Sequence, residues 1–499
     1  MLFRHVVHIK KVSDFTLNLH TIFPKLLCTA LLLTAAQNTC FAFEWQDPFG
    51  TMNRVETPFA MKGSDFSNCH TQASADAVIS LSDAVASSLC HNPKTKEAWA
   101  TLQAQAAQVG IAQSAYLPNL SLMGQVVKNS SSNQGTNTIG QPFSYSSNSN
   151  NFSGSVNLNW VLYDFGLRSS VLDNAQKTLL SAMAKQDSVL QSVIANTVKD
   201  YYAALVAQKN IEANRQFETN AKQVLEMTTA RVNSGVAAIS DQLQAKTAYS
   251  QAVYNRHKAE GDWFTALGVV AIDMGKRPTS TLRLSASQHA QSPTIFVQSV
   301  DSLLQSAQET HPALRAARAE RDAAEANETS ITAQGRPSFS LIGQYSHNQQ
   351  SESAGGGQPY IDTNRQGRYV GVKLDVPLFE GFGRTYKVRN AEAQTAVKQA
   401  SLDSAELEVA VRVWTNYQLL QVNAINIQTS QEIVQSAEQA FKAAQSRYLR
   451  GVADIQELLN SQNTFANATQ QQIKAVADWQ NARIQMAASV GNLNITSIQ

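Results

Sequence analysis

The side chains of this 499-residue chain that could do chemistry do not form a catalytic set. No paired His, Asp and Ser motif occurs in a credible context, and no residue spacing is typical of a metal site. Gly355-Gly356-Gly357 has no strand-to-helix context, so it does not predict a phosphate loop. What remains are carboxylates near two Gly-Val turns, Asp241, Asp454 and Glu457. Because none of the motifs for catalysis, metal binding or phosphate binding is present, the sequence predicts no enzyme, no metal and no cofactor.

Two cysteines, Cys69 and Cys90, remain if residues 1–42 are removed. In an exported, oxidising setting an even pair is a disulfide candidate, here joining the segment before the first helix to that helix. The alternative is two free buried thiols, and the compartment favours the disulfide.

The amino terminus has the plan of a secretory signal peptide. Four basic residues precede an eleven-residue apolar run at 26–36: Arg4, Lys10, Lys11 and Lys25. Ala42 supplies the small residue for cleavage, so residues 1–42 are predicted to be removed. A transmembrane anchor is the alternative, but it needs about 20 apolar residues. A second alternative is a lipidated Cys40, although residues 37–39 lack the small and aliphatic residues of such a site.

The charge balance of the remaining chain argues against nucleic acid. Removing residues 1–42 takes away four basic residues and one acidic residue, which leaves 36 Lys+Arg against 37 Asp+Glu. A near-neutral chain has no electrostatic basis for binding nucleic acid. Since no remaining stretch reaches about 18 apolar residues, a membrane-spanning part would have to consist of strands.

The chain is a tandem duplication of roughly 200 residues per unit. Asn92-Pro93 matches His311-Pro312 at an offset of 219, and the same offset relates residues 117–125 to 336–344. Later matches follow an offset of 216: Arg231 with Arg447, Gly235 with Gly451, and Val236 with Val452. The first unit is predicted to span residues 43–290 and the second 291–499.

Each unit contains one predicted strand hairpin. Period-two alternation of apolar side chains is found in four segments: residues 120–126, 156–162, 339–345 and 370–378. The polar, Gly/Ser/Asn-rich stretches at residues 129–151 and 347–366 are predicted to be long exposed loops. The hairpins are therefore placed at about residues 118–164 and 337–379.

The rest of each unit is predicted to be helical, with a break near Pro93. Two proline-free runs of 67 residues would reach about 100 Å as continuous helices, and helices of this length usually pack as coiled coils. Apolar residues recur at helical spacing in both runs: Ile194, Val198, Tyr201 and Leu205, and Leu407, Val411 and Trp414. The predicted helices span about residues 75–115, 166–234 and 237–272, and then 300–335, 383–450 and 453–490.

Four strands with one apolar face cannot close a barrel, because even the smallest membrane barrels use about eight. An open strand edge in lipid would leave backbone groups unpaired. The chain is therefore predicted to oligomerise. The alternative is a soluble β-sandwich joined to coiled coils.

Short motifs mark the ends of the predicted elements: His91-Asn92-Pro93, Tyr116-Leu117-Pro118, residues 163–166 and 379–383, and the Arg-x-x-x-Gly-Val turns at 231 and 447. In these motifs the sequence resembles the TolC family of outer-membrane factors across essentially the whole mature chain. The resemblance implies an α+β membrane protein in the outer membrane of a Gram-negative bacterium. It implies a homotrimer with a 12-stranded β-barrel, continued by a long α-helical coiled-coil tunnel through the periplasm.

The family works with a periplasmic adaptor protein and an inner-membrane ABC or proton-driven transporter. The resemblance therefore implies an outer-membrane channel-tunnel of a tripartite export system, in contact with outer-membrane lipid. The segments around Cys69, residues 89–93 and residues 98–100 are similar to CyaE-type members, which serve type I secretion of toxins or adhesins. The alternatives are multidrug or small-molecule efflux and, more remotely, a non-channel coiled-coil surface protein.

The resemblance also implies a gate at the end of the tunnel. Asp241 and Tyr448 align with gate positions of the family, and Glu457 falls where the family has an inward aspartate. A ring of three carboxylates is then possible. Ala453 stands where the family has its gating arginine, and Asn460 stands where it has a second constricting aspartate.

Both positions depart from the residues of the family's salt-bridge lock. Arg450 could supply a substitute cation, and Asp454 lies beside it in the same turn. The alternative is that these charged residues simply solvate a helix surface. Gly235 and Gly451 are better explained as helix-turn glycines than as functional groups.

Overall fold

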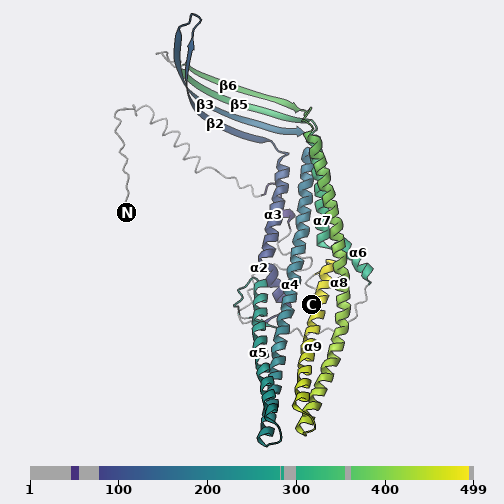
Figure 1. Cartoon of the computed structure of the whole chain (residues 1–499). Helices are drawn as coiled ribbons and strands as arrows, with labels where there is room; N and C mark the ends of the chain where they lie inside the picture. Colours follow the sequence, from purple (N-terminus) through teal and green to yellow (C-terminus); the bar gives the residue numbers. More distant parts are fainter. Residues whose placement is uncertain (1–46, 56–77, 281, 286–298, 354–360, 494–499) are drawn as a thin grey trace, which may run out of the picture. The chain divides into compact units, whose positions relative to one another are not determined.

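The computed structural model describes residues 47–55, 78–280, 282–285, 299–353 and 361–493 (Figure 1). The predicted signal peptide at 1–42 lies outside these ranges, as does Cys69. The chain divides into two units, residues 1–50 and 51–499. All helices and strands of the described ranges belong to the second unit.

A four-stranded antiparallel sheet is built from two hairpins, one from each repeat (Figure 1). β2 (Asn119–Thr136) pairs with β3 (Pro142–Tyr163), and β5 (Ser338–Ser353) pairs with β6 (Ile361–Asp375). β3 and β5 join the two hairpins, with Trp160 opposite Leu341. The strand order is β2-β3-β5-β6.

The strands are much longer than the sequence pattern predicts. The prediction of long loops at residues 129–151 and 347–366 is wrong. The β2–β3 ladder continues to the pair Thr136 and Pro142, and the β5–β6 ladder continues to the pair Glu352 and Ile361. Ser, Asn and Gln occupy both faces there, so no apolar alternation marks the strands. Asn137 closes the first hairpin, since its Oδ1 accepts backbone hydrogen bonds of 3.2 and 2.8 Å.

The two outer strands of the sheet, β2 and β6, present exposed apolar side chains. Within the described ranges neither strand has a second partner on its outer edge. Leu122, Val126 and Val370 are among the most exposed large apolar residues of the chain. Open strand edges beside exposed apolar side chains require a covering partner.

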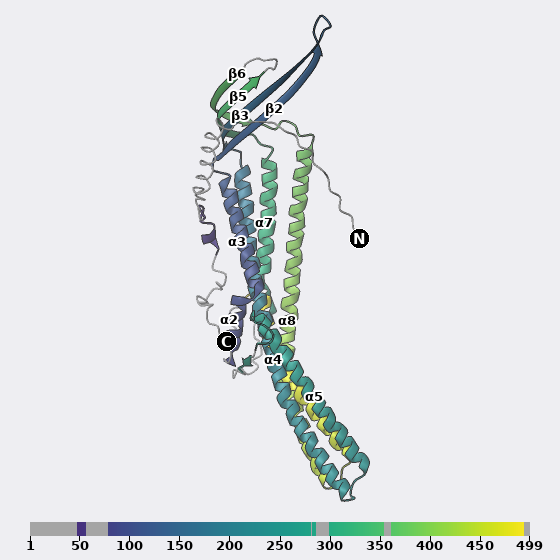
Figure 2. The ribbon, with the colours of Figure 1, turned by 90° about the vertical axis from the view of Figure 1, so that its left-hand side faces the viewer.

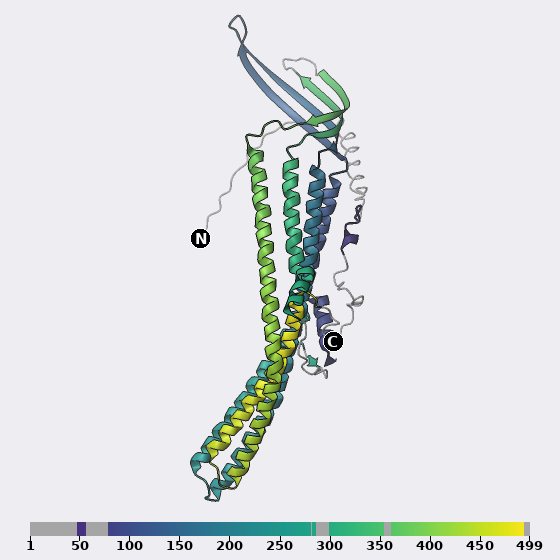
Figure 3. The ribbon, with the colours of Figure 1, turned by 90° about the vertical axis from the view of Figure 1, so that its right-hand side faces the viewer.

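Each repeat also contributes a long helical hairpin (Figures 2 and 3). In the first repeat α4 (Leu167–Asn233) packs against α5 (Ile239–Asp273), and in the second α8 (Gly383–Leu449) packs against α9 (Ile455–Val490). α3 (Pro93–Ser114) lies on α4, and α7 (Pro312–Ala333) lies between α4 and α8. No helix of the described ranges is long and apolar enough to span a membrane.

Short elements lie against the longer helices: η1 (Met52–Arg54), which contacts α3, α2 (Leu81–His91), α6 (Val300–Thr310), and the parallel pair β1 (Val78–Ile79) and β4 (Arg283–Leu284). α2 packs on α4, and α6 packs on α8 and α9. Tyr201 anchors the first group, since its hydroxyl lies 3.0 and 2.8 Å from the carbonyl oxygens of Ile79 and Ser285. Burial raises the pKa of Tyr201 to about 12.

Equivalent residues break the helices in both repeats. α3 follows Asn92, and α7 follows His311; each side chain accepts a hydrogen bond from the backbone N–H two residues on, at 3.0 and 3.2 Å. Pro93 and Pro312 occupy the first helical position, where a missing N–H costs little. Burial lowers the pKa of His311, which favours the neutral ring that can accept this bond.

Candidate functional site at the helical turns

The predicted gate residues lie at two helical turns, one between α4 and α5 and one between α8 and α9 (Figure 1). Gly235 and Gly451 have φ angles of 74° and 78°, a region that glycine adopts without strain. In each turn the residue after the glycine donates its N–H to the carbonyl of Arg231 or Arg447, at 2.9 and 3.0 Å. The two turns therefore have nearly the same backbone.

Tyr448 lies inside the contact between the two helical hairpins. Its side chain is 2 % exposed and belongs to a cluster with Val224 of α4 and Leu458 of α9. Its hydroxyl is 3.3 Å from the Oγ1 of Thr228. In the single chain, Tyr448 thus fastens α8 to α4.

Arg231 is the cation that contacts Tyr448. The guanidinium carbon is 4.7 Å from the centre of the tyrosine ring, and Nη1 donates a hydrogen bond to the Tyr448 carbonyl oxygen. The last carbonyls of a helix lack intrahelical partners, and a cation there also interacts favourably with the helix dipole. Sequence reasoning missed this role, although the repeated Arg-x-x-x-Gly-Val motif marks the residue.

The predicted carboxylates have separate partners. Glu457 forms an ion pair of 2.7 Å with Arg447, and Asp454 caps α9 by accepting the Glu457 N–H at 2.7 Å. Asp241 is half-buried and accepts a 3.2 Å hydrogen bond from the preceding serine hydroxyl. Arg450 ends α8 and is exposed, and no contact among the described residues joins it to Asp241. A single chain therefore does not bring together the five predicted gate residues, which are Asp241, Tyr448, Arg450, Asp454 and Glu457.

Cys90 is buried on α2 and is disulfide-bonded. Its partner lies outside the described residues. The pairing with Cys69 stays a prediction.

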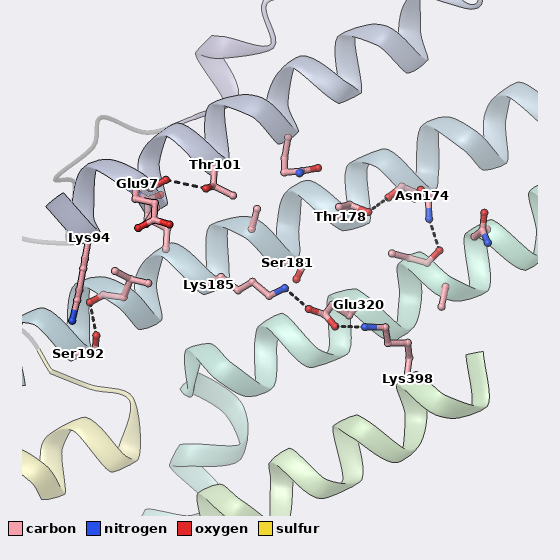
Figure 4. A pocket seen from close by; sticks show the side chains of 18 residues that line it. Lys94, Glu97, Thr101, Asn174, Thr178, Ser181, Lys185, Ser192, Glu320 and Lys398 are labelled. Atoms are coloured by element: carbon pink, nitrogen blue, oxygen red, sulfur yellow. Dashed lines mark hydrogen bonds and ion pairs between the residues drawn. The ribbon is translucent and has the colours of Figure 1, made fainter. Parts of the chain in front are cut away.

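Two grooves run along one face of α4 toward the turns. The first has a volume of about 780 Å³ and is bounded by α3, α4, α7 and α8 (Figure 4), and the second has about 1130 Å³ and is bounded by α4, α5 and α9. The α4 residues that line the two grooves, between Asn174 and Phe217, follow the helical period, so they share one helix face. The second groove reaches Leu243 and Gln456, close to the turns.

Glu320 of α7 links α4 and α8 across the first groove (Figure 4). Its carboxylate pairs with Lys185 of α4 and, at 2.7 Å, with Lys398 of α8. Partial burial alone would raise the pKa of Glu320, but the two ammonium groups outweigh it and hold the pKa below its usual value. The groove wall thus carries charges of both signs, which are paired with each other across three helices.

Comparison with known proteins identifies the fold. The solved outer-membrane channel OprN superposes with a TM-score of 0.68 at 19 % identity, covering 83 % of this chain and 90 % of that one. Protein CyaE of Bordetella pertussis is 27 % identical, over 84 % of this chain and 85 % of its own length. Outer membrane protein TolC of Vibrio cholerae serotype O1 is 26 % identical, over 68 % and 77 %. The fold is therefore that of an outer-membrane channel.

The family follows from a match to each repeat. The model of the outer membrane efflux protein family matches residues 84–269 and 303–492, and the chain belongs to that family. This confirms the predicted TolC-like fold, the tandem repeat and a non-enzymatic transport role. The protein is an outer-membrane efflux channel of tripartite export systems, with a helical periplasmic part. The β-sandwich and the non-channel surface protein are thereby set aside.

Proposed function

We propose that three copies of this chain form a closed channel-tunnel that works with a periplasmic adaptor and an inner-membrane transporter. The supporting observation is the four-stranded sheet with two open edges and exposed apolar side chains. Three copies with four strands each would contribute 12 strands. The smallest membrane barrels need only about eight. Closure would also pair every open edge, as a lipid environment requires.

In this assembly the two helical turns act as the gate. Asp241, Asp454 and Glu457 would place carboxylates at the constriction, and Arg450 would supply a cation from its exposed position at the end of α8. Tyr448 acts differently, because it is buried and fixes the end of α8 to α4. The likeness of both turn backbones supports a gate built from both repeats.

Conductance of purified trimers in planar bilayers tests the gate. The wild type is expected to conduct poorly, and the double variant Asp241→Ala with Tyr448→Phe is expected to conduct better. Lys209→Ala, which removes an exposed ion pair of α4 away from the turns, is the matched control. Unchanged low conductance in the double variant would contradict the gate, whereas soluble monomers would contradict the channel.

The cargo that we propose is a protein toxin or adhesin delivered by type I secretion. The support is the similarity to CyaE, at 27 % identity over 84 % of the chain. Small-molecule efflux is the alternative, because the same scaffold serves both. Deletion of the gene separates them: type I secretion predicts that a protein cargo of an ABC exporter is retained in the cell, with drug susceptibility unchanged. Drug hypersensitivity with normal protein export would favour efflux.

A further inference from the structure

One contact between the repeats is buried within the chain. The start of α9 packs across the end of α4, where Ile455 and Leu459 are 4 % and 9 % exposed. They share a cluster with Val224 of α4 and with Tyr448. The second repeat thus covers one side of the first.

The equivalent positions of the first repeat are uncovered. At the offset of 216, Ile455 and Leu459 correspond to Ile239 and Leu243 of α5, which are 61 % and 58 % exposed. The residue types are identical, so only the surroundings differ. The start of α5 lacks the neighbouring helix that α4 provides for α9.

A second part of the contact between α4 and α9, farther from the turns, is likewise uncovered at the equivalent positions of α8. Val198 of α4 is fully buried beside Ile484 of α9, whereas its equivalent Trp414 on α8 is 53 % exposed. Leu407 and Val411 continue this apolar stripe along α8. Within the chain, an apolar surface of α4 contacts an apolar surface of α9. The equivalent surfaces, on α8 and α5, are exposed at opposite edges of the chain. The occupant that matches both edges is a second copy of this chain, placed head to tail.

Arg231 marks the same asymmetry at the turns. Its Nη2 lies 3.6 Å from the position that a Cβ on Gly451 would occupy, whereas nothing lies within 4 Å of that position at Gly235. Among the described residues no side chain donates a hydrogen bond to the carbonyl of Val232, the equivalent of Tyr448. The end of α4 thus lacks the cation that the end of α8 has.

We propose that Arg447 is a two-position switch, which binds the carboxyl end of α4 of the next copy in the closed tunnel and returns to Glu457 in the open tunnel. Arg447 is the repeat equivalent of Arg231 and is 55 % exposed, with Glu457 at 2.7 Å. An exposed ion pair of this kind is weak, so the competing partner can displace it. The switch rests on the proposed trimeric channel.

Single-channel recording tests the switch through variants with opposite effects. Arg447→Ala removes the closed-state contact, so the ratio of open to closed states should rise roughly twofold to fivefold per copy, as expected for a charge at a helix end. Glu457→Gln removes the competing partner and should lower that ratio. Lys442→Ala and Glu438→Gln, which break another exposed ion pair of α8, should leave it unchanged. If Arg447→Ala and Glu457→Gln shift the ratio in the same direction, the pair is only structural and the proposal is overturned.

Cross-linking tests the contact independently of conductance. A short bis-maleimide should join Arg231→Cys to Arg450→Cys within one chain, giving a monomer on a denaturing gel. The repeat-equivalent pair, Arg447→Cys with Ser234→Cys, should give dimers and trimers. Cys90 is disulfide-bonded and does not react. Only monomers from the second pair would overturn the proposal, whereas cross-linked copies that do not conduct would contradict the channel instead.

Discussion

The turn at Gly235 and the turn at Gly451 share a backbone but not an environment. Both have a left-handed glycine and the same return hydrogen bond to an arginine carbonyl. The second turn contributes Tyr448 and Ile455 to a buried cluster, whereas the equivalent Val232 is half-buried and the equivalent Ile239 is exposed. Local sequence thus determines the shape of each turn, and the neighbouring repeat determines its burial. The predictions below act on positions that the repeats share.

The largest expected difference is in the loss of unfolding free energy, between the variants Tyr448→Ala and Val232→Ala. Removing a fully buried aromatic side chain should lower the free energy of unfolding by about 3–5 kcal/mol. The equivalent Val232 is only half-buried, so its truncation should cost much less. Thermal unfolding followed by circular dichroism measures both. Equal losses would mean that Tyr448 does not fasten the two hairpins.

A smaller difference in stability is expected from the residues that precede α9 and α5, just after the two turns. Asp454 caps α9, so Asp454→Ala should destabilise by about 1 kcal/mol. Its equivalent in the first repeat is Ala238, which makes no side-chain cap on α5. Ala238→Asp should therefore stabilise by a similar amount, as read from the unfolding midpoint in denaturant. A neutral Ala238→Asp would show that this turn cannot use a cap.

One pH effect on stability should arise from a pair of carboxyl groups that only the first repeat contains. Burial, and then a hydrogen bond with Asp200, raises the pKa of Asp273 from 3.8 to about 6, whereas the equivalents in the second repeat are Ser489 and Asn416. A raised carboxyl pKa means that the folded chain binds the proton more tightly than the unfolded chain does. Its contribution to stability is present below about pH 4 and is lost as the pH rises to about 6.

Asp273→Asn should flatten that part of the pH profile of stability. Asp262→Asn, which changes an exposed carboxylate on the same helix, should leave the slope as in the wild type. Unfolding midpoints between pH 4 and pH 7 provide the measurement. A slope that survives Asp273→Asn would assign the effect to other carboxylates.

Much of the fold could be predicted because its boundaries use residues with special backbone requirements. Pro93 and Pro312 can start a helix but not continue one, and Gly235 and Gly451 adopt a left-handed turn. The outer parts of the strands could not be predicted. Their Ser, Asn and Gln side chains suit water on both faces, so only backbone pairing defines them.

The site could be predicted only in part. The resemblance pointed to Asp241 and Tyr448, but not to the burial of Tyr448 or to its contact with Arg231. Periodicity cannot supply this information, because Ile239 and Ile455 have the same residue type and helical position and yet differ in burial. Which helix lies opposite is a property of the tertiary structure.

The covalent joining of two repeats has a mechanical consequence for the proposed ring. Its six helical hairpins would meet at six contacts, here called seams. Three seams would lie within chains and three between chains, in alternation. The seam within each chain contains the buried Tyr448 and the half-buried Arg231, whereas the seam between chains would have Val232 at the position equivalent to Tyr448. In the proposed ring the seams between chains would therefore be the weaker ones, and the ring would widen there while each chain stays whole.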